Sequence, residues 1–172
     1  MTPWSLTHEP AATIEQKAAP MTEHPPFRYY LRVRYGECDQ QGVVYNARYG
    51  DYVDLASTEF LRATFAPLNC FDGSFEFQVV KMLIEWTGPA RFDDTLAVDV
   101  TLEKLGTTSY TLGFAMRRAN ETTTIVTAET VNVYVDPKTW TKAPLPEDFR
   151  ARLTAAACGQ VVDHGGFGAQ QG

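Results

Sequence analysis

The stretch YGECDQQGVVYNARYGDYVD, from Tyr35 to Asp54, joins a segment of alternating apolar residues to a segment of helical spacing. Two acids, Glu37 and Asp39, stand at this junction on either side of Cys38. A strand that runs into a helix does not require carboxylates at the join. The two acids are therefore candidates for chemistry as well as for turn formation.

The segments that flank this junction have different periods. The alternation over 27–35 predicts a strand with one solvent-facing side, closed by Tyr35. The spacing of apolar residues over 46–65 predicts a helix, with Asn46 as its N-cap and an end before Pro67.

The rest of the chain reads mainly as strands. Residues 75–86 are nearly continuously apolar, which predicts a strand buried on both faces or lying at an interface. Further strands are expected over 96–102 and 110–116 and up to 131–135, with a short helix after Pro146. One helix separate from a run of strands predicts the α+β class with an antiparallel sheet. The spare apolar surface of such a sheet predicts an oligomer.

Length and composition limit the function classes. A chain of 172 residues with 44% hydrophobic residues suits one domain, and a net charge of −6 argues against a nucleic-acid surface. The sequence shows no apolar run of membrane-span length and no signal-peptide pattern at its start. Three cysteines without a CxxC motif disfavour a disulfide framework or a zinc site, so we expect a cytoplasmic protein without a metal.

The expected domain organisation is a folded segment between two tails. Prolines without a period predict a flexible extension over 1–26, and Gly- and Gln-rich residues predict a flexible tail over 158–172. The folded domain is expected over 27–157. All three histidines fall in the expected tails, which predicts a core without imidazole and disfavours Ser-His-Asp, Cys-His and His–metal sites: His8, His24 and His164.

The opening stretch resembles the motif of the 4-hydroxybenzoyl-CoA thioesterase family, including its YbgC-like branch. The matching positions are an aromatic residue, two acids, a glycine, two apolar residues and the helix start: Tyr35, Glu37, Asp39, Gly42, Val43, Val44 and Tyr49. The later segments GPARFDDTL and LGTTSYTL also resemble the family. The resemblance covers about 27–155 and implies the hot-dog fold, a curved antiparallel sheet wrapped around one long helix.

The resemblance also implies a site and a reaction. It places Asp39 as the catalytic aspartate, at a dimer interface, and puts a backbone N–H near Asn46 against the thioester oxygen. The YbgC-like branch often has a histidine at the position of Asn46. The implied substrate is an acyl-CoA. No separate cofactor is implied, because coenzyme A is part of that substrate. The implied assembly is a homodimer or homotetramer.

Each candidate residue also has a structural interpretation. Asp39 is otherwise a turn aspartate, and Gly42 provides either a backbone shape or room for substrate. Tyr45 lines an acyl pocket or packs in the core. Arg91 is the first candidate for the phosphates of coenzyme A and Ser109 a weaker polar contact. Other basic residues are ordinary surface charges when taken singly: Lys81, Lys104, Arg117 and Arg118.

Other functions fit the same pattern. A thioesterase for carrier-protein-bound acyl chains uses the same site, and a non-catalytic acyl-CoA-binding protein gives no reason for an acid at Asp39. A hot-dog dehydratase usually needs a histidine with an acid, which the expected lack of a core histidine disfavours.

Overall fold

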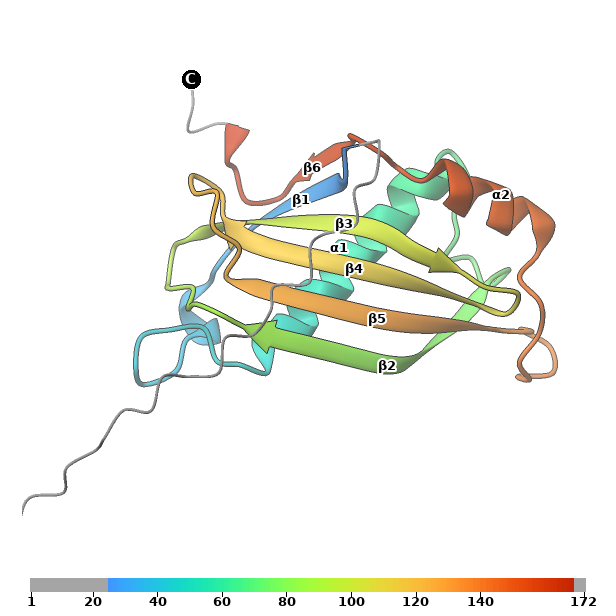
Figure 1. The fold of residues 1–172 in the computed structure, drawn as a ribbon, viewed down its shortest axis with the longest axis horizontal. Helices are drawn as coiled ribbons and strands as arrows, with labels where there is room; N and C mark the ends of the chain where they lie inside the picture. The colour runs from blue at the N-terminus through green and yellow to red at the C-terminus, as the bar shows by residue number, and fades with distance from the viewer. Residues whose placement is uncertain (1–24, 169–172) are drawn as a thin grey trace, which may run out of the picture.

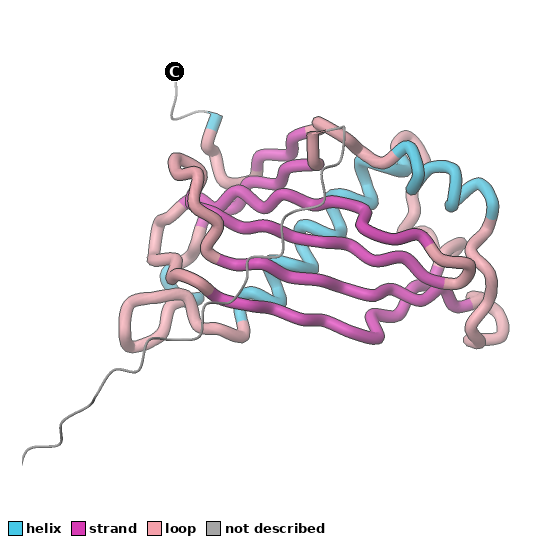
Figure 2. The backbone as a smooth tube through the Cα atoms, in the orientation of Figure 1, coloured by secondary structure: helices cyan, strands magenta, loops and turns pink. Residues whose placement is uncertain are grey.

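The computed structural model describes residues 25–168 of the chain (Figures 1 and 2). The predicted extension over 1–26 therefore falls almost entirely outside the described residues. In chain order the elements are β1 (Phe27–Arg32), the 3₁₀ turn η1 (Tyr35–Glu37), α1 (Arg48–Phe65), β2 (Glu76–Trp86), β3 (Thr95–Leu105), β4 (Ser109–Arg118), β5 (Val126–Val135), α2 (Glu147–Ala155) and β6 (Val161–Asp163).

The strands form one six-stranded sheet in the order β2-β5-β4-β3-β1-β6. Four of the five pairings are antiparallel, as predicted, but β6 runs parallel to β1. The sheet is therefore mixed and not entirely antiparallel. Part of the segment expected to be a flexible C-terminal tail is a strand of this sheet, because the backbone of 161–163 pairs with Arg28 to Tyr30.

Helix α1 crosses one face of the sheet (Figure 1). Its buried residues recur at helical spacing: Tyr49, Tyr52, Val53, Ala56, Phe60, Leu61 and Phe65. Alternate residues of β1 face the same core, including Phe27, Tyr29 and Leu31. The predicted α+β class and hot-dog arrangement, with one long helix against the sheet, are confirmed.

The first strand ends earlier than predicted. It stops at Arg32, and Tyr35 begins the 3₁₀ turn instead of closing the strand. The side chain of Glu37 explains this turn, because its Oε2 accepts a hydrogen bond from the backbone N–H of Arg34 at 2.7 Å. That bond bends the chain away from the sheet three residues before Glu37.

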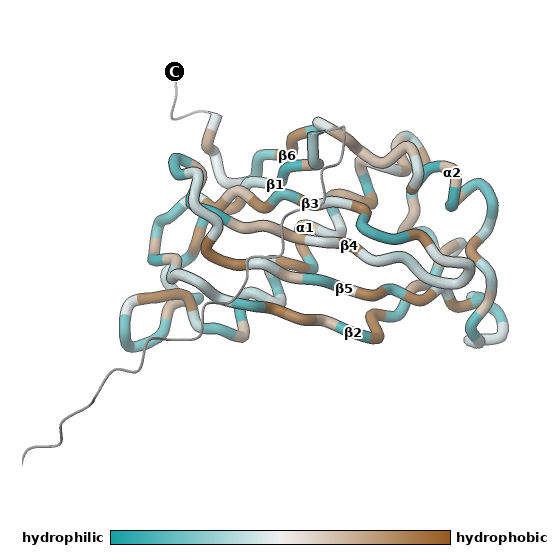
Figure 3. The backbone as a smooth tube through the Cα atoms, viewed as in Figure 1, coloured by the Kyte–Doolittle hydropathy of each residue, from teal (hydrophilic) through white to brown (hydrophobic). Residues whose placement is uncertain are grey.

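Strand β2 lies at one edge of the described sheet, and much of its length is hydrophobic (Figure 3). Val80 is 61% exposed and Val79 is 52% exposed, so burial on both faces is wrong for this strand within one chain. Of the two interpretations of 75–86 from the sequence, a strand at an interface remains. Within residues 25–168 the strand has a ladder of hydrogen bonds on one side only, to β5, and its other side is unpaired.

Candidate active site

Residues 37–45 form a tight loop between η1 and α1, here called the Asp39 hairpin. The N–H of Tyr45 donates to the carbonyl of Glu37 at 2.9 Å, and the N–H of Asp39 donates to the carbonyl of Val43 at 2.8 Å. These two bonds define a base, next to α1, and a tip. Glu37 therefore lies at the base of the hairpin and Asp39 at its tip.

The tip holds Asp39 in a fixed position. Its carbonyl accepts the N–H of Gly42 at 3.0 Å, and its Oδ1 accepts the N–H of Gln41 at 2.8 Å. The other carboxylate oxygen, Oδ2, accepts no hydrogen bond from any residue within 25–168. Asp39 thus has the turn geometry of the structural interpretation and also one carboxylate oxygen left for chemistry.

Gly42 is selected by backbone conformation. Its φ is +74°, in the left-handed region that other L-residues rarely adopt, whereas a Cβ there would meet no atom within 4 Å. This agrees with the expected role in backbone shape. The glycine lets the chain reverse at the tip, so that Val43 returns to pair with Asp39.

The GPARFDD turn packs against the hairpin. Val43 and Arg91 pair across an isolated antiparallel bridge, and the N–H of Val44 donates to the carbonyl of Ala90 at 2.9 Å. Arg91 is exposed, and its guanidinium has no hydrogen-bond or ion-pair partner among the described residues. The structure therefore brings Arg91 to the same loop cluster as Asp39 and leaves its charge available.

Helix α1 begins directly after the hairpin, at Arg48 and not at Asn46 as predicted. The N–H of Arg48 donates to the carbonyl of Tyr45 at 2.8 Å, and the N–H of Tyr49 donates to that of Asn46 at 3.3 Å. Backbone carbonyls accept the hydrogen bonds of these N–H groups, and the side chain of Asn46 makes no capping bond. The N-cap prediction is therefore wrong. The backbone N–H groups of Asn46 and Ala47 have no partner in the described chain. They lie at the positive end of the helix dipole.

Aromatic and apolar side chains flank the helix start. Tyr45 is 53% exposed, so core packing does not account for it. The ring centroid of Tyr49 lies 6.2 Å from that of Trp86, at the end of β2. A Cβ on Gly50 would lie 3.9 Å from the sulfur of Met82, so the first turn of α1 lies against β2. The helix start therefore lies next to the exposed edge of the sheet.

Glu37 at the hairpin base is held through one of its carboxylate oxygens. Its Oε2 accepts the hydroxyl of Tyr52 at 2.7 Å in addition to the N–H of Arg34. Burial of the phenol, aided by this carboxylate, raises the pKa of Tyr52 well above its usual range. Tyr52 therefore stays neutral and donates. These contacts give Glu37 a structural role.

Ser109 lies far from the other candidates. It starts β4, where its carbonyl accepts the N–H of Gly106 across the β3–β4 turn. The Asp39 hairpin lies at the opposite end of β3, which is 11 residues or roughly 35 Å long. Figure 1 shows the two loops at opposite ends of the sheet. The position of Ser109 within one chain gives no support to its predicted contact with the substrate.

Most of the other basic candidates are already paired. Lys81 forms an ion pair with Glu129 at 2.7 Å, and Arg118 forms one with Glu121 at 2.7 Å. Arg117 lies 3.9 Å from a carboxylate oxygen of Asp99. Arg91 therefore remains the first choice for the phosphates of coenzyme A.

One histidine does lie in the folded part of the chain, which corrects the expectation from the sequence. His164 follows β6, and its Nδ1 lies 3.3 Å from the hydroxyl of Tyr29 on β1. The two rings meet edge to face at 5.4 Å. The sequence argument failed because the pairing of β6 with β1 joins segments about 130 residues apart, which no local pattern reveals.

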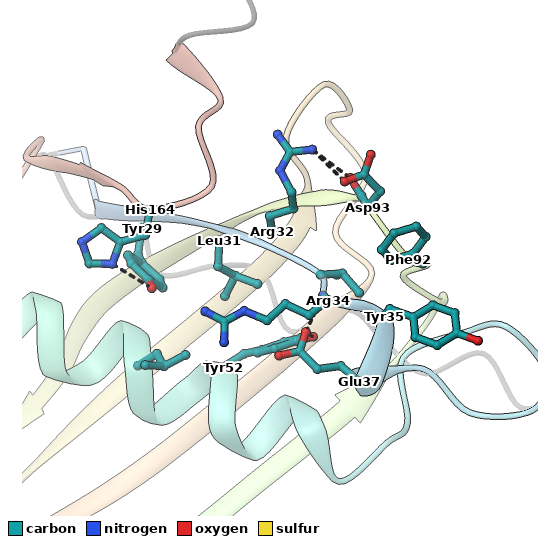
Figure 4. Close-up of a pocket in the computed structure, with 12 residues that line it drawn as sticks. Tyr29, Leu31, Arg32, Arg34, Tyr35, Glu37, Tyr52, Phe92, Asp93 and His164 are labelled. Carbon is teal, nitrogen blue, oxygen red and sulfur yellow. Dashed lines mark hydrogen bonds and ion pairs between the residues drawn. The ribbon is translucent and has the colours of Figure 1, made fainter.

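A cavity of about 570 Å³ lies beside this histidine and does not include Asp39 (Figure 4). Sequence reasoning missed this cavity, here called the β1 pocket. Its lining residues come mainly from β1, the η1 turn and α1: Tyr29, Leu31, Arg32, Val33, Arg34, Tyr35, Glu37, Tyr52, Leu55, Phe92, Asp93 and His164. The only sequence signal was the alternation of arginines along 27–35, which equally fits a solvent-facing strand.

Two further searches of residues 25–168 gave negative results. No group of three or more His, Cys, Asp or Glu side chains is arranged to hold a metal ion. Neither of the described α-helices combines the length and the apolar content needed to cross a membrane.

Comparisons with known proteins agree on one family. Residues 33–153 match the sequence profile of the Thioesterase-like superfamily. The acyl-CoA thioester hydrolase YbgC of Escherichia coli is 36% identical over 129 residues, which are 74% of this chain and 95% of that protein. A hypothetical protein from Thermus thermophilus superposes with a TM-score of 0.67 at 26% identity, over 74% of this chain and 97% of the other. The probable thioesterase YbaW of Escherichia coli gives 0.64 at 25% identity, over 73% and 95%. The matched range includes the Asp39 hairpin and α1.

Proposed function

The chain belongs to the Thioesterase-like superfamily, and on that premise we propose that it is an acyl-CoA thioesterase with Asp39 as its catalytic carboxylate. The reaction is hydrolysis of a thioester to a carboxylic acid and free coenzyme A. The similarity to YbgC, which is named for this activity, supports the substrate class.

One observation carries the assignment of the residues. Among the described residues, a carboxylate with an unbonded Oδ2 and two backbone N–H groups without a partner, those of Asn46 and Ala47, belong to one short segment. The hairpin bonds hold the carboxylate, and the first turn of α1 holds the N–H groups.

The proposed chemistry uses both groups. In one route Asp39 takes a proton from water as the water attacks the carbonyl carbon, and the C–S bond then breaks. In the other route Oδ2 itself attacks, the thiolate leaves, and water hydrolyses the resulting mixed anhydride. In both routes the proton balance ends with a carboxylic acid and the free thiol. The thiolate is a good leaving group, so neither route needs an imidazole.

The helix start stabilises the negative charge that develops on the thioester oxygen. Free N–H groups at a helix N-terminus donate to an anion without reorganisation, and the helix dipole adds to the attraction. The side chain of Asn46 is not required for this role, because the donor is the backbone. Arg91 is proposed to contact a phosphate of coenzyme A, since its exposed guanidinium is unpaired beside the hairpin.

We further propose that two copies of the chain associate through β2. An 11-residue edge strand with exposed valines and an unpaired ladder is suited to pairing with a second copy. The helix start lies against the same strand through Met82, so the partner would enclose the site. Coenzyme A esters would then bind between the copies.

A hydrolysis screen tests the function. Purified protein is given short-chain, long-chain and aryl CoA esters and the matching carrier-protein thioesters, and the released thiol is measured. Turnover of CoA esters above that of carrier-protein esters supports the proposal. Turnover of carrier-protein esters alone would favour the close variant. Saturable binding of CoA esters without release of thiol would identify a non-catalytic binding protein.

Matched charge insertions test the association. Val80→Lys places a charge on the β2 edge, and Val161→Lys makes the same change on the exposed β6 edge, where the valine is 59% exposed. Light scattering coupled to size exclusion should show that Val80→Lys lowers the oligomeric mass while Val161→Lys does not. Equal mass for both variants and the wild type would contradict an interface at β2.

A further inference from the structure

The β1 pocket has the size and composition of a small-molecule site. Its volume of about 570 Å³ falls within the usual range for such sites. It lies between β1, the outer side of α1 and the turn that holds Phe92, whereas Asp39, Asn46 and Arg91 are not among its lining residues. The pocket is therefore separate from the proposed hydrolytic site.

The two arginines and two acids of the pocket balance in formal charge, but only one ion pair forms between them. The guanidinium of Arg32 is paired with Asp93 at 3.1 Å and also donates to the carbonyl of Gly165 at 3.0 Å. The carboxylate of Glu37 accepts its two hydrogen bonds from Tyr52 and from a backbone N–H. Both acids are thus engaged within the protein.

Arg34 is the exception. Within residues 25–168 its guanidinium has no hydrogen bond and no ion pair. In Figure 4 its side chain extends across the pocket between Leu31 and Tyr52. Its charge acts on Tyr29, where it opposes the rise in the phenol pKa that burial causes. The pocket therefore presents one guanidinium without a direct carboxylate partner among the described residues, close to the Tyr29–His164 pair.

The rest of the lining is apolar or aromatic. Leu31 and Val33 are buried in the floor, and Leu55 of α1 is 46% exposed. Tyr35 and Phe92 meet edge to face at 5.8 Å, although they are 81% and 56% exposed. Aromatic pairs of this kind usually form in a protein interior, so this pair offers a contact surface for an apolar group.

We propose that the β1 pocket binds a small carboxylate with an apolar body. The carboxylate pairs with Arg34 and lies near the Tyr29 hydroxyl, and the apolar body contacts Leu55 and the Tyr35–Phe92 pair. A monoanion fits better than a phosphate dianion, because the carboxylates of Glu37 and Asp93 line the same cavity and repel the second charge. The inference does not depend on the thioesterase activity.

Calorimetric titration tests the charge requirement, with 4-phenylbutyrate as the probe and 4-phenylbutyramide as its neutral match. We expect saturable binding of the acid. The affinity for the amide should be lower by about tenfold or more, since a charge-assisted hydrogen bond is lost. The Arg34→Gln variant should bind the acid more weakly than the wild type does, by a similar factor. Lys138→Gln, which removes one positive charge in an exposed turn, should leave the affinity unchanged.

The position of binding needs its own measurement, because a thioesterase can also bind an acid at its hydrolytic site. Leu55→Trp fills the pocket from an exposed position and should reduce binding, whereas Asp39→Asn should not. Thermal unfolding of each variant controls for folding. Absence of saturable binding to wild type overturns the proposal, as does equal affinity in the wild type and the folded Arg34→Gln variant. Loss of binding in Asp39→Asn with retention in Leu55→Trp assigns the acid to the hydrolytic site and also overturns it.

Discussion

The tip and the base of the Asp39 hairpin each carry an acid, two residues apart in the sequence, and the structure treats them differently. At the base, Glu37 accepts hydrogen bonds from Tyr52 and from the backbone of Arg34, both at 2.7 Å. At the tip, Asp39 accepts its short side-chain bond from Gln41 of its own turn, and its Oδ2 has no partner among the described residues. Glu37 thus ties the hairpin to α1 through Tyr52, whereas the carboxylate of Asp39 is bonded only within the hairpin and is left for chemistry.

This difference gives a way to separate folding from chemistry within nine residues. A change at the tip should alter turnover and leave stability nearly constant. A change at the base should alter stability first. The variants below are ordered from the largest expected effect to the smallest, and each tests one side of the comparison.

Asp39→Asn should give the largest effect. The amide keeps the size of the side chain and its oxygen can still accept the N–H of Gln41, but it neither takes a proton from water nor attacks a carbonyl. We expect kcat to fall by about 10²- to 10⁴-fold, the range of a lost general base. Steady-state hydrolysis of the best CoA ester measures this, with thermal unfolding as control. Turnover equal to wild type in a folded variant would exclude Asp39 as the catalytic group.

Asn46→Pro should have the next largest effect, and Asn46→Ala is its matched control. Proline removes the backbone N–H proposed to hold the thioester oxygen, whereas alanine removes only an exposed side chain that caps nothing. Loss of one such donor typically lowers kcat by about 10²- to 10³-fold. We expect that fall for proline and a change within about threefold for alanine. The same kcat in both variants would show that the side chain or another donor holds the oxygen.

The sequence predicted the parts of this fold that depend on local pattern. The helix ends at Phe65, before Pro67, and the long apolar strand over 76–86 lies where it was expected. A turn was also expected at Asp39, and the structure has one there, at the tip of the Asp39 hairpin. These features follow from periodicity, from proline chemistry and from a turn that is encoded within four residues.

The parts that depend on distant pairing were not predicted. Strand β6 is three residues long, and its partner lies about 130 residues earlier, so His164 appeared to belong to a tail. Asn46 looked like an N-cap because its residue type favours that position, but the carbonyls of the preceding turn took the first N–H groups. Arg34 is exposed, as the alternation over 27–35 predicts, although it follows β1 instead of lying in it. A distant strand pairing explains the miss at His164, and local backbone bonds explain the miss at Asn46.

Glu37→Gln tests the base of the hairpin. The amide is nearly isosteric and its oxygen can still accept, but both hydrogen bonds lose their charge assistance, and the NH₂ group must be placed in a partly buried site. We expect the free energy of unfolding to fall by about 1 to 3 kcal/mol. Chemical denaturation measures this value. Combining the change with Tyr52→Phe should give less than the sum of the two single effects, because one change weakens and the other removes the same hydrogen bond.

The outcome for catalysis distinguishes the two acids. If Glu37 is structural, kcat in Glu37→Gln should stay within about tenfold of wild type below the unfolding transition, far from the loss expected for Asp39→Asn. A loss of kcat as large as that of Asp39→Asn, with stability unchanged, would reverse the assignment of the two acids.

Gly42→Ala should have the smallest effect. A Cβ at this position meets no atom within 4 Å, so the cost comes from the φ of +74° alone and should be about 1 kcal/mol of unfolding free energy. Gly36→Ala is the matched control, because its added Cβ also meets no neighbour and its φ is not positive. Denaturation curves of the two variants isolate the conformational term. If both variants lose the same stability, the left-handed turn is not what requires glycine, and room for a bound substrate at the tip becomes the better explanation.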